Sequence, residues 1–397
     1  MEPTPTAGCR ALSPIKADEE NRILQSVRDA AREETAWESG FVFNTLCCRP
    51  HPLAVKAFAE FADRNLLKEQ STAGRRMERE VVREYSSWFG AAEQEGRNGY
   101  ICSGGTEGNF VALWAAKARQ PNRRKVVVSR YAHYSYDRFG LPLGLSIISI
   151  PLDENLEVQK SAFLEAIDSA TLAVVVTAGD PVLGRVDPLL EIVAAAREKG
   201  CATHIDAAYG GYLLPFLDEY RTVYGHVLSP GFGVDTLTLD PHKYGLCPLG
   251  TGLILFSDKQ DLDRVSFSVP FPPIESRTFQ GSRSGGPTAA VWAMLRLLGW
   301  PGYADLAESV VAKRIYMENR LRSLPELEFV VQPRMTSVGF RIRGDEAGTR
   351  ALYDKLCEAG YRITPQVRPA FFMRIIAHHH TELAHIDRLV DTIRRQL

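Results

Sequence analysis

The sequence predicts an α/β protein, with a large domain built on a mostly parallel sheet and a smaller α+β domain after it. Between residues 100 and 258, short apolar runs such as VVVS, SIISI, AVVVTAG and ATHID alternate with helical stretches such as PLLEIVAAAREKG. Strands that alternate with helices are typical of a parallel sheet whose ligands bind at the strand ends. From about Trp300 the pattern changes to one long helix, followed by the strands LEFVVQ, SVGFRIR and FFMRIIA with further helices from about Glu346 and Thr381.

The region before the sheet is mainly helical. Residues 17 to 36 are charged with a helical pattern, a second helix is expected over residues 53 to 64, and STAGRRMEREVVREYSSWFG predicts an amphipathic helix that ends at Gly90. The polar, proline-rich N-terminus is expected to be disordered or to wrap a partner subunit. We divide the chain into an N-terminal segment (1–45), a large domain (46–300) and a small C-terminal domain (301–397).

Composition excludes several classes of protein. The chain has 397 residues, 45% hydrophobic and 24% charged, which is ordinary for a soluble enzyme. A net charge of -1 gives no reason to expect nucleic acid or an anionic membrane as a partner. The seven cysteines are dispersed without zinc-site spacing, and neither a signal peptide nor a membrane-length apolar run is visible. We therefore expect reduced thiols and a cytoplasmic location.

The most informative stretch is TLTLDPHKYG, residues 236 to 245. Its first residues alternate as a strand, and the loop GLCPLGTG leads from it into a second strand, LILFSD. Lys243 therefore lies in a turn between two strands, beside Asp240 and His242, and not on a solvated helix face. A single lysine in such a turn is usually a surface residue, so its interpretation depends on two other stretches.

Asp206 and a glycine-rich turn supply the other two groups. Asp206 lies in the apolar strand of CATHIDAAYGGYLLPF, where an unpaired carboxylate is costly, so a cation is expected to meet it. That cation is either an ion-pair partner or a protonated ring nitrogen. In GYICSGGTEGN, a short strand enters a Gly-Gly turn that includes Gly105, and Thr106 opens a helix whose free N–H groups suit a phosphate.

An anion site, a buried carboxylate and a turn lysine together match the needs of pyridoxal 5′-phosphate. The glycine-rich turn would hold the phosphate, Asp206 would keep the pyridine nitrogen protonated, and Lys243 would form the Schiff base. The turn is neither a dinucleotide fingerprint nor a Walker loop, which makes a nicotinamide-dependent oxidoreductase a remote alternative.

The chain resembles the pyridoxal-phosphate-dependent group II amino-acid decarboxylases, in particular archaeal tyrosine/aspartate decarboxylases and bacterial histidine decarboxylases, and more distantly sphingosine-phosphate lyase. The resemblance runs from about Leu46 to the C-terminus and rests on CSGGTEGN, AHYSYDR, HIDAAYGGYLLPF, DPHKYG, GSRSGG and FFMRIIAHH, in that order. It implies the transferase-like fold known as fold type I, with a seven-stranded sheet in the large domain. It also implies decarboxylation of an L-amino acid to an amine and CO2 by a homodimer with shared active sites.

The resemblance assigns roles to further residues around the cofactor. It implies that His133 stacks on the pyridine ring, that Ala208 packs beneath it, and that His242 bonds the phosphate or takes part in proton transfer. It also implies that Ser282 and Arg283 help to close the phosphate site from the neighbouring subunit. The residues alone leave simpler roles open, namely packing for His133, support of the lysine turn for His242, and a helix N-cap for Ser282.

Three residues are expected on the substrate side. Arg374, in the strand MRIIA, would clamp the substrate carboxylate, or else lie at a strand edge in water. His51 belongs to a segment that reaches the active site in the family, or else packs at a helix N-terminus. Phe271, in the proline-rich loop SFSVPFPPIESRTFQGSRSGG, falls where the family has a tyrosine that protonates the α-carbon.

Phenylalanine cannot donate a proton, so Phe271 leaves the reaction open. The chain either decarboxylates with another acid, forms an aldehyde by oxidative deamination, or catalyses another carbon–carbon lyase reaction; a non-catalytic homologue that binds the cofactor is a further alternative. Asp180 also departs from the pattern, because the relatives carry a hydroxyl residue there, and Thr177 is the nearest candidate to replace it. No metal is expected at His378, His379 and His380, since three adjacent residues cannot all face one ion.

Overall fold

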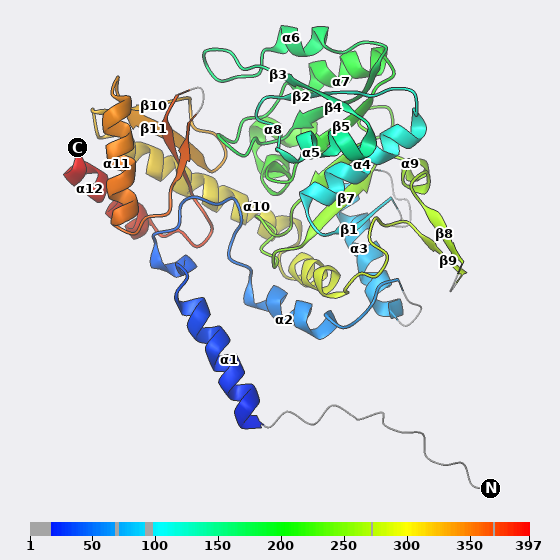
Figure 1. Cartoon of the computed structure of the whole chain (residues 1–397), viewed down its shortest axis with the longest axis horizontal. Helices are drawn as coiled ribbons and strands as arrows, with labels where there is room; N and C mark the ends of the chain where they lie inside the picture. The colour runs from blue at the N-terminus through cyan, green and yellow to red at the C-terminus, as the bar shows by residue number, and fades with distance from the viewer. Residues whose placement is uncertain (1–16, 68–70, 92–97, 271–272, 368–369) are drawn as a thin grey trace.

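The computed structural model describes residues 17–67, 71–91, 98–270, 273–367 and 370–397. It contains a large domain around a seven-stranded sheet and a small domain around a four-stranded sheet (Figure 1). Among the described residues, no helix combines the length and apolar character that crossing a bilayer requires.

The large sheet has the strand order β1-β7-β6-β5-β4-β2-β3. The pairs from β3 through β2, β4 and β5 to β6 are parallel, and β7 is antiparallel to both β6 and β1. The mostly parallel, seven-stranded sheet expected from the sequence is therefore confirmed. Its strands are β1 (Gly99–Cys102), β2 (Lys125–Ser129), β3 (Ser146–Ile150), β4 (Thr171–Thr177), β5 (Ala202–Asp206), β6 (Thr236–Leu239) and β7 (Gly252–Phe256).

Helices cover both faces of this sheet, which explains why its strands are continuously apolar. On β1, Ile101 packs into the core with α3 (Thr72–Trp88), whereas Tyr100 and Cys102 pack with α4 (Gly105–Arg119). Successive strand residues point to opposite faces, so α3 and α4 lie on opposite sides. The other helices of the domain are α2 (Pro52–Phe61), α5 (Ser135–Leu143), α6 (Lys160–Glu165), α7 (Leu189–Glu198), α8 (Asp218–Tyr224) and α9 (Lys259–Asp263), with short 3-10 turns at Gly210–Tyr212 and Leu214–Phe216.

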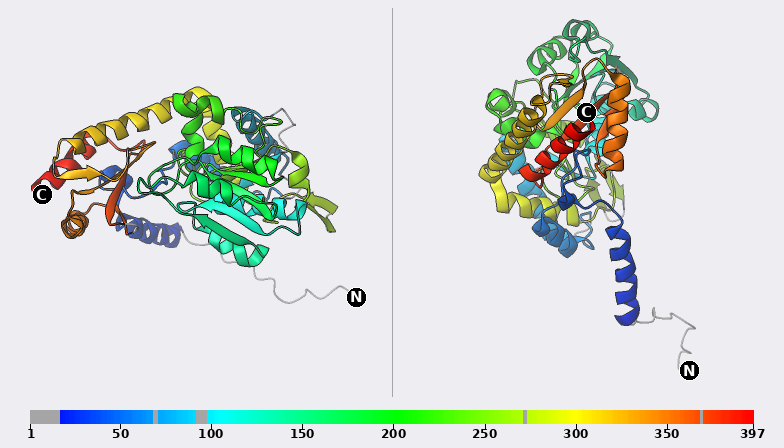
Figure 2. Two further views of the ribbon diagram at one scale, coloured as in Figure 1. Left: turned by 90° about the horizontal axis from the view of Figure 1, so that it is seen from above. Right: turned by 90° about the vertical axis from the view of Figure 1, so that its left-hand side faces the viewer.

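The helix α10 (Gly286–Arg322) connects the two domains, as Figure 2 shows from above. It is kinked at Gly299, whose φ of 55° and ψ of -166° are non-helical, just before Pro301. The small sheet has the order β10-β11-β13-β12, and all of its pairs are antiparallel. Its elements are β10 (Leu327–Phe329), β11 (Ser337–Ile342), α11 (Glu346–Glu358), β12 (Thr364–Gln366), β13 (Phe372–Ile376) and α12 (Leu383–Gln396).

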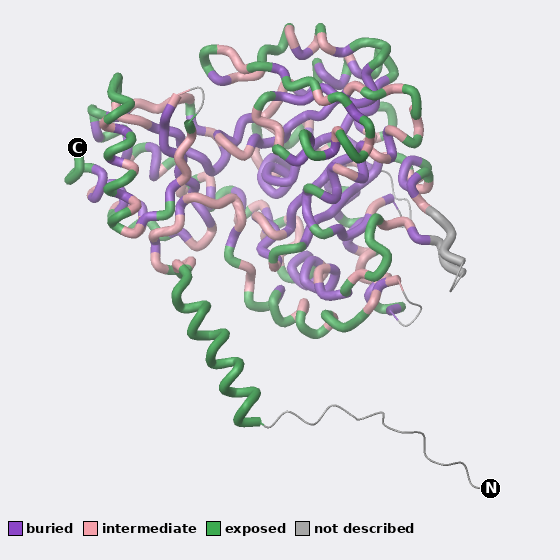
Figure 3. Tube along the Cα trace, in the orientation of Figure 1, coloured by how far each residue is buried: buried purple, intermediate pink, exposed green. Residues whose placement is uncertain are grey.

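The N-terminal segment leaves the body of the protein and then returns to it. The helix α1 (Ala17–Arg32) has no buried residue and projects from the body, as the exposed colouring in Figure 3 makes clear. After a 3-10 turn (Trp37–Ser39), the chain crosses the small domain, where Phe43 joins that domain's core. The expected boundaries at residues 45 and 300 stay predictions, because α10 and this segment both contribute to the small domain.

One secondary-structure expectation is wrong. The proline-rich stretch after Ser266 is not simply a loop, because β8 (Phe267–Pro270) and β9 (Pro273–Ser276) pair as an antiparallel hairpin. Two of the prolines are opposite each other at the last pair, Pro270 with Pro273, where the ladder ends and a missing N–H is tolerated. Phe271 lies outside the described residues.

Candidate active site

A cavity of about 310 Å³ lies where several strands of the large sheet end. Apart from Leu46 and Cys47, the residues that line it end or follow β1, β2, β4, β5 and β6, at the edge where parallel-sheet proteins bind ligands. The lining residues are Leu46, Cys47, Ser103, Gly104, Gly105, Thr106, Asn109, His133, Tyr134, Thr177, Gly179, Pro181, Asp206, Ala208, Tyr209, Asp240, His242 and Lys243. The sheet thus brings the predicted lysine, carboxylate and glycine-rich turn to one cavity, although they are far apart in sequence.

Lys243 lies in the turn after β6, and its side chain is 14% exposed. Its Nζ is 3.1 Å from Oδ2 of Asp240, whose side chain is 5% exposed. Burial alone would lower the pKa of Lys243, but the carboxylates of Asp240 and Asp206 outweigh it and raise that pKa above its ordinary value. The lysine is therefore an ammonium held against Asp240.

Asp206 ends β5 and is held by three donors. Its Oδ2 accepts from Asn109 Nδ2 at 2.8 Å and from the Tyr136 hydroxyl at 3.2 Å, and its Oδ1 accepts from the backbone N–H of Ala208 at 3.2 Å. The residue is only 6% exposed. These bonds fix the carboxylate at the cavity wall, which is the requirement for holding one ring nitrogen.

A chain of hydrogen bonds behind Asp206 has a defined direction. Asn109 donates its amide N–H to Asp206, so its Oδ1 must accept from Nε2 of His204, 3.0 Å away. His204 Nδ1 then accepts from the Thr236 hydroxyl at 2.8 Å. Burial lowers the pKa of His204 to about 4, so the ring is neutral and carries the single proton that this chain requires. His204 and Asn109 therefore orient Asp206 from the sheet interior.

The glycine-rich turn forms a cradle at the start of α4. Gly104 has a φ of 145°, which favours glycine, and a Cβ on Gly105 would meet Asp240 Oδ2 and Ala208 Cβ, both at 3.1 Å. A Cβ on Gly252, opposite the turn, would lie 2.5 Å from Gly104 Cα. The first N–H groups of a helix have no partner within the helix, so a phosphate can approach Gly105 and Thr106 there. The glycine-rich turn, the Asp206 carboxylate and Lys243 together fit the groups of pyridoxal phosphate.

Both predicted histidines line the cavity. His133 follows β2, and its Nδ1 is 2.9 Å from the Ser135 hydroxyl. Burial lowers the pKa of His133, so a neutral, flat ring is available beside the cavity. His242 has its Nδ1 2.7 Å from the carbonyl oxygen of Thr251, to which it donates. Ala208 also lines the cavity, as expected for the small residue under the ring.

Four other predicted residues are not among those that line the cavity. His51 caps α2, with its Nδ1 accepting from Leu53 N–H at 3.1 Å. Ser282 is exposed and accepts from Asn65 Nδ2 at 3.2 Å, while Arg283 is paired with Glu78 through 2.7 and 3.0 Å bonds. Arg374 donates to the carbonyls of Pro181 and Asn44 and to the Thr364 hydroxyl. The substrate roles of His51 and Arg374, and the phosphate roles of Ser282 and Arg283, stay predictions.

The structure also identifies residues that sequence reasoning missed. Asn109 stands in the motif CSGGTEGN, and its position one helical turn after the Gly-Gly turn was the available signal. Tyr209 lines the cavity, and its hydroxyl is 2.6 Å from Oγ1 of Thr336 in the small domain. Cys47 lines the cavity from the N-terminal segment, and no local sequence pattern predicts this position. Thr177 lines the cavity, so it remains the candidate hydroxyl.

Comparisons with known proteins agree with this geometry. Residues 7–343 match the model of the pyridoxal-dependent decarboxylase conserved domain. The chain is 30% identical over 389 residues to a probable L-aspartate decarboxylase of Thermococcus gammatolerans, covering 96% of this chain and 98% of that one. It is 32% identical over 363 residues to a probable L-tyrosine/L-aspartate decarboxylase of Methanothermobacter thermautotrophicus, covering 89% and 96%. Its structure matches the sphingosine-1-phosphate lyase of Burkholderia pseudomallei with a TM-score of 0.83 at 25% identity, covering 98% and 92%.

Proposed function

Because this chain belongs to the pyridoxal-dependent decarboxylase family, an amino-acid decarboxylase family whose cofactor is pyridoxal 5′-phosphate, we propose that Lys243 bonds the cofactor and that the cavity at the strand ends is the active site. The family, fold and cofactor expected from the sequence are confirmed. The observation that carries the proposal is that Lys243, Asp206 and the Gly105 cradle line one cavity.

The residues of the cavity have distinct tasks in this proposal. When bound, pyridoxal phosphate supplies an electron sink for the pair released as the substrate loses CO2. Lys243 must give up a proton from Nζ before it can bond to a carbonyl, and Asp240 Oδ2, at 3.1 Å, is within reach to accept it. Asp206 would hold a proton on the ring nitrogen of the bound cofactor, because its three donors keep the carboxylate in place without neutralising its charge.

The substrate is proposed as a small L-amino acid. Aspartate and tyrosine are the first to test, because the names of the relatives refer to them. Arg374 is proposed to bind the substrate carboxylate, and since its two terminal nitrogens donate to Pro181, Asn44 and Thr364, a carboxylate would have to replace one of these acceptors. His51 would contribute through the α2 N-terminus. The roles of Ser282 and Arg283 at the phosphate require a neighbouring subunit.

We propose a homodimer because α1 exposes apolar side chains that its own chain does not cover. This helix exposes Ile23, Leu24 and Val27, which are 53%, 42% and 61% exposed, and it buries nothing in its own chain. An isolated helix of 16 residues is marginally stable in water, so an apolar face of this kind needs a partner surface. A second copy of the chain is the occupant we propose, in the cytoplasm, where the six described free cysteines would stay reduced.

Replacing Lys243 tests the assignment. Lys243→Ala is expected to abolish the absorption band of the lysine–cofactor Schiff base and to lower the rate of CO2 release below detection with aspartate and tyrosine. Lys160→Ala, which changes an exposed lysine, should leave both unchanged. Borohydride reduction of the wild type should attach the cofactor to the peptide that contains Lys243.

A Lys243→Ala protein that keeps the band would refute the assignment. Product analysis separates the alternatives, since amine plus CO2 indicates simple decarboxylation, whereas aldehyde, ammonia and peroxide indicate oxidative deamination. The second outcome would favour the alternative raised by Phe271.

A further inference from the structure

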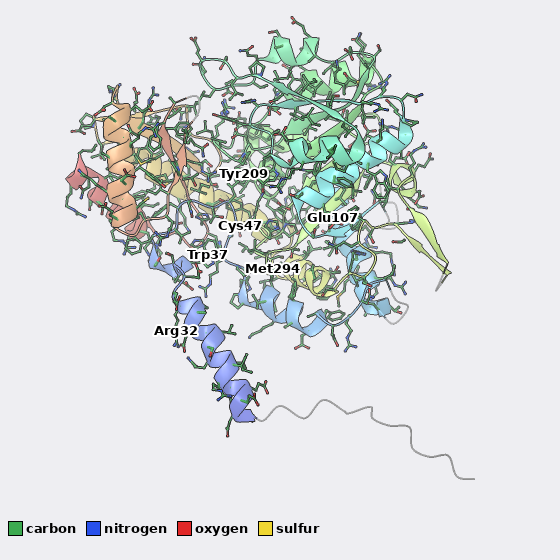
Figure 4. All side chains as sticks on the ribbon, in the orientation of Figure 1. Arg32, Trp37, Cys47, Glu107, Tyr209 and Met294 are labelled. Carbon is green, nitrogen blue, oxygen red and sulfur yellow. The ribbon has the colours of Figure 1, made fainter. Side chains whose placement is uncertain are left out.

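Cys47 enters the active-site cavity on an extended segment that the small domain holds in place. The segment is fixed by a 2.9 Å bond from Phe43 N–H to the Arg362 carbonyl and by a 2.6 Å contact of His378 Nε2 with the Thr45 carbonyl. The Cys47 N–H donates to the Thr45 hydroxyl at 3.0 Å. Figure 4 labels Cys47 between the two domains, and it lines the same cavity as Lys243. These bonds to the small domain therefore fix the position of Cys47.

His242 is oriented so that its second nitrogen faces Cys47. Nδ1 must carry a hydrogen, because its 2.7 Å partner, the Thr251 carbonyl, can only accept. Nε2 is then the nitrogen left to interact with Cys47, which lines the same cavity, and Asp240 Oδ2 is 3.5 Å away from it. A thiol beside an imidazole whose other nitrogen is held by a third group is the arrangement that moves protons in cysteine–histidine pairs.

The surrounding charges favour proton exchange between these two side chains. Burial raises the pKa of Cys47, but His242 and Lys243 outweigh it and the pKa falls below its ordinary value. Burial lowers the pKa of His242, but Cys47 and Asp240 outweigh it and the pKa rises, despite the opposing charge of Lys243. For the neighbouring Cys48 thiol, by contrast, burial is the largest cause and raises its pKa far above the ordinary value. The two pKa values of the pair thus approach each other.

We propose that Cys47 and His242 form the acid that returns a proton to the α-carbon of the substrate after CO2 has left. The proposal rests on the proposed function of the cavity. The bond between the α-carbon and the carboxylate carbon breaks, CO2 leaves, and the electron pair becomes a new C–H bond whose proton comes from the Cys47 thiol. His242 Nε2 reprotonates the sulfur and regains its proton from water, so each turnover consumes one proton and needs no oxidant or reductant.

The first test uses the protein without cofactor and follows alkylation of its thiols by iodoacetamide, with peptide mass spectrometry. Cys47 is expected to react at least 10-fold faster than the half-buried Cys357 at neutral pH. The midpoint of the pH dependence of its alkylation rate should lie below that of an ordinary thiol. His242→Gln should move the midpoint of Cys47 upward and leave Cys357 unchanged. A Cys47 profile that is insensitive to His242→Gln would overturn the pairing.

The second test uses the holoenzyme and compares Cys47→Ala, Cys47→Ser and Cys357→Ala. Cys47→Ala should lower kcat about 100-fold, the scale of one general acid, with little change in KM or cofactor affinity. Cys47→Ser, which keeps a weaker acid, should lie between it and the wild type, and the pH dependence of kcat should change in both. Unchanged kcat in Cys47→Ala, or a parallel loss of cofactor affinity, would overturn the proposal.

The proposed function can fail separately from this inference. A wild-type protein that forms no Schiff base with pyridoxal phosphate would refute the function of the cavity. A wild-type protein that forms the Schiff base and releases CO2, while Cys47→Ala does so equally fast, would refute only the role of Cys47.

Discussion

Removal of the Asp180 carboxylate should destabilise the large domain and loosen the cavity wall. Asp180, 3% exposed, accepts from the backbone N–H groups of Val182 and Leu183 through Oδ1, at 2.8 and 2.7 Å. Its Oδ2 accepts from Arg185 N–H at 2.9 Å and forms an ion pair with Arg185 Nε at 3.1 Å. The side chain therefore organises the whole turn that presents Pro181 to the cavity.

The cost of Asp180→Ala follows from the burial of its partner. Arg185 is 6% exposed, its Nη1 has no partner among the described residues, and its guanidinium lies over the Tyr131 ring, 4.9 Å from the ring centroid. Leaving one charge of a buried pair alone costs about 3–5 kcal/mol. For a domain of this size, a loss of 1 kcal/mol lowers Tm by about 2–4 °C, so Tm should fall by roughly 6–20 °C.

Differential scanning calorimetry measures this change, and two further variants control it. Glu191→Ala removes an ion pair with Lys160 whose side chains are 47% and 55% exposed, and such pairs contribute about 1 kcal/mol or less. Asp180→Leu combined with Arg185→Leu removes both buried charges and should recover the part of the loss that comes from the unpaired Arg185 charge, but not the part that comes from the three backbone N–H groups. If Asp180→Ala melts no lower than Glu191→Ala, the ion pair is not what stabilises this turn.

The remaining predictions concern assembly and pH. Ile23→Glu combined with Val27→Glu should convert the proposed dimer to monomers in sedimentation experiments without lowering the Tm of the single chain, because α1 buries nothing in its own chain; a dimer that persists would contradict the role of α1. Burial lowers the pKa of His204, His378 and His379 to about 4, below the unfolded value of about 6.5, so the unfolded chain binds more protons between these pH values. The free energy of unfolding should therefore fall as pH drops from 6.5 towards 4, against an opposing trend from Asp187, whose pKa burial raises to about 7. Equal midpoints of urea unfolding at pH 7 and pH 5 would contradict the expectation that the three histidines outweigh Asp187.

Much of the fold could be predicted because its signals are local. The strand β4 is buried along its whole length, and its apolar run already identifies a strand covered on both faces. The kink of α10 at Gly299 lies beside the point where the sequence pattern changes. The hairpin of β8 and β9 was missed because prolines argue against strands, and only the pairing register places Pro270 and Pro273 at its end.

The candidate site likewise contains residues that local motifs predict and residues that only long-range contacts reveal. Lys243, Asp206 and Gly105 each stand in a short motif whose residue types limit the chemistry, so they could be named before the structure. Asn109 and His204 bond to each other across 95 residues of sequence, and no local pattern reports such a contact. The Asp180 residue, which seemed only to remove a hydroxyl, proved to be the acceptor for a buried turn.

The sequence by itself determined most of the order of strands and helices, the cofactor chemistry and three candidate groups for it, because residue type and short spacing are properties of a local stretch. The tertiary structure alone decided that Cys47 stands beside His242, and that Arg374 is bonded to carbonyls of two other segments. These contacts depend on how the small domain and the N-terminal segment close over the sheet. The relative positions of these parts are set by packing between segments that are distant in sequence, which local sequence patterns cannot predict.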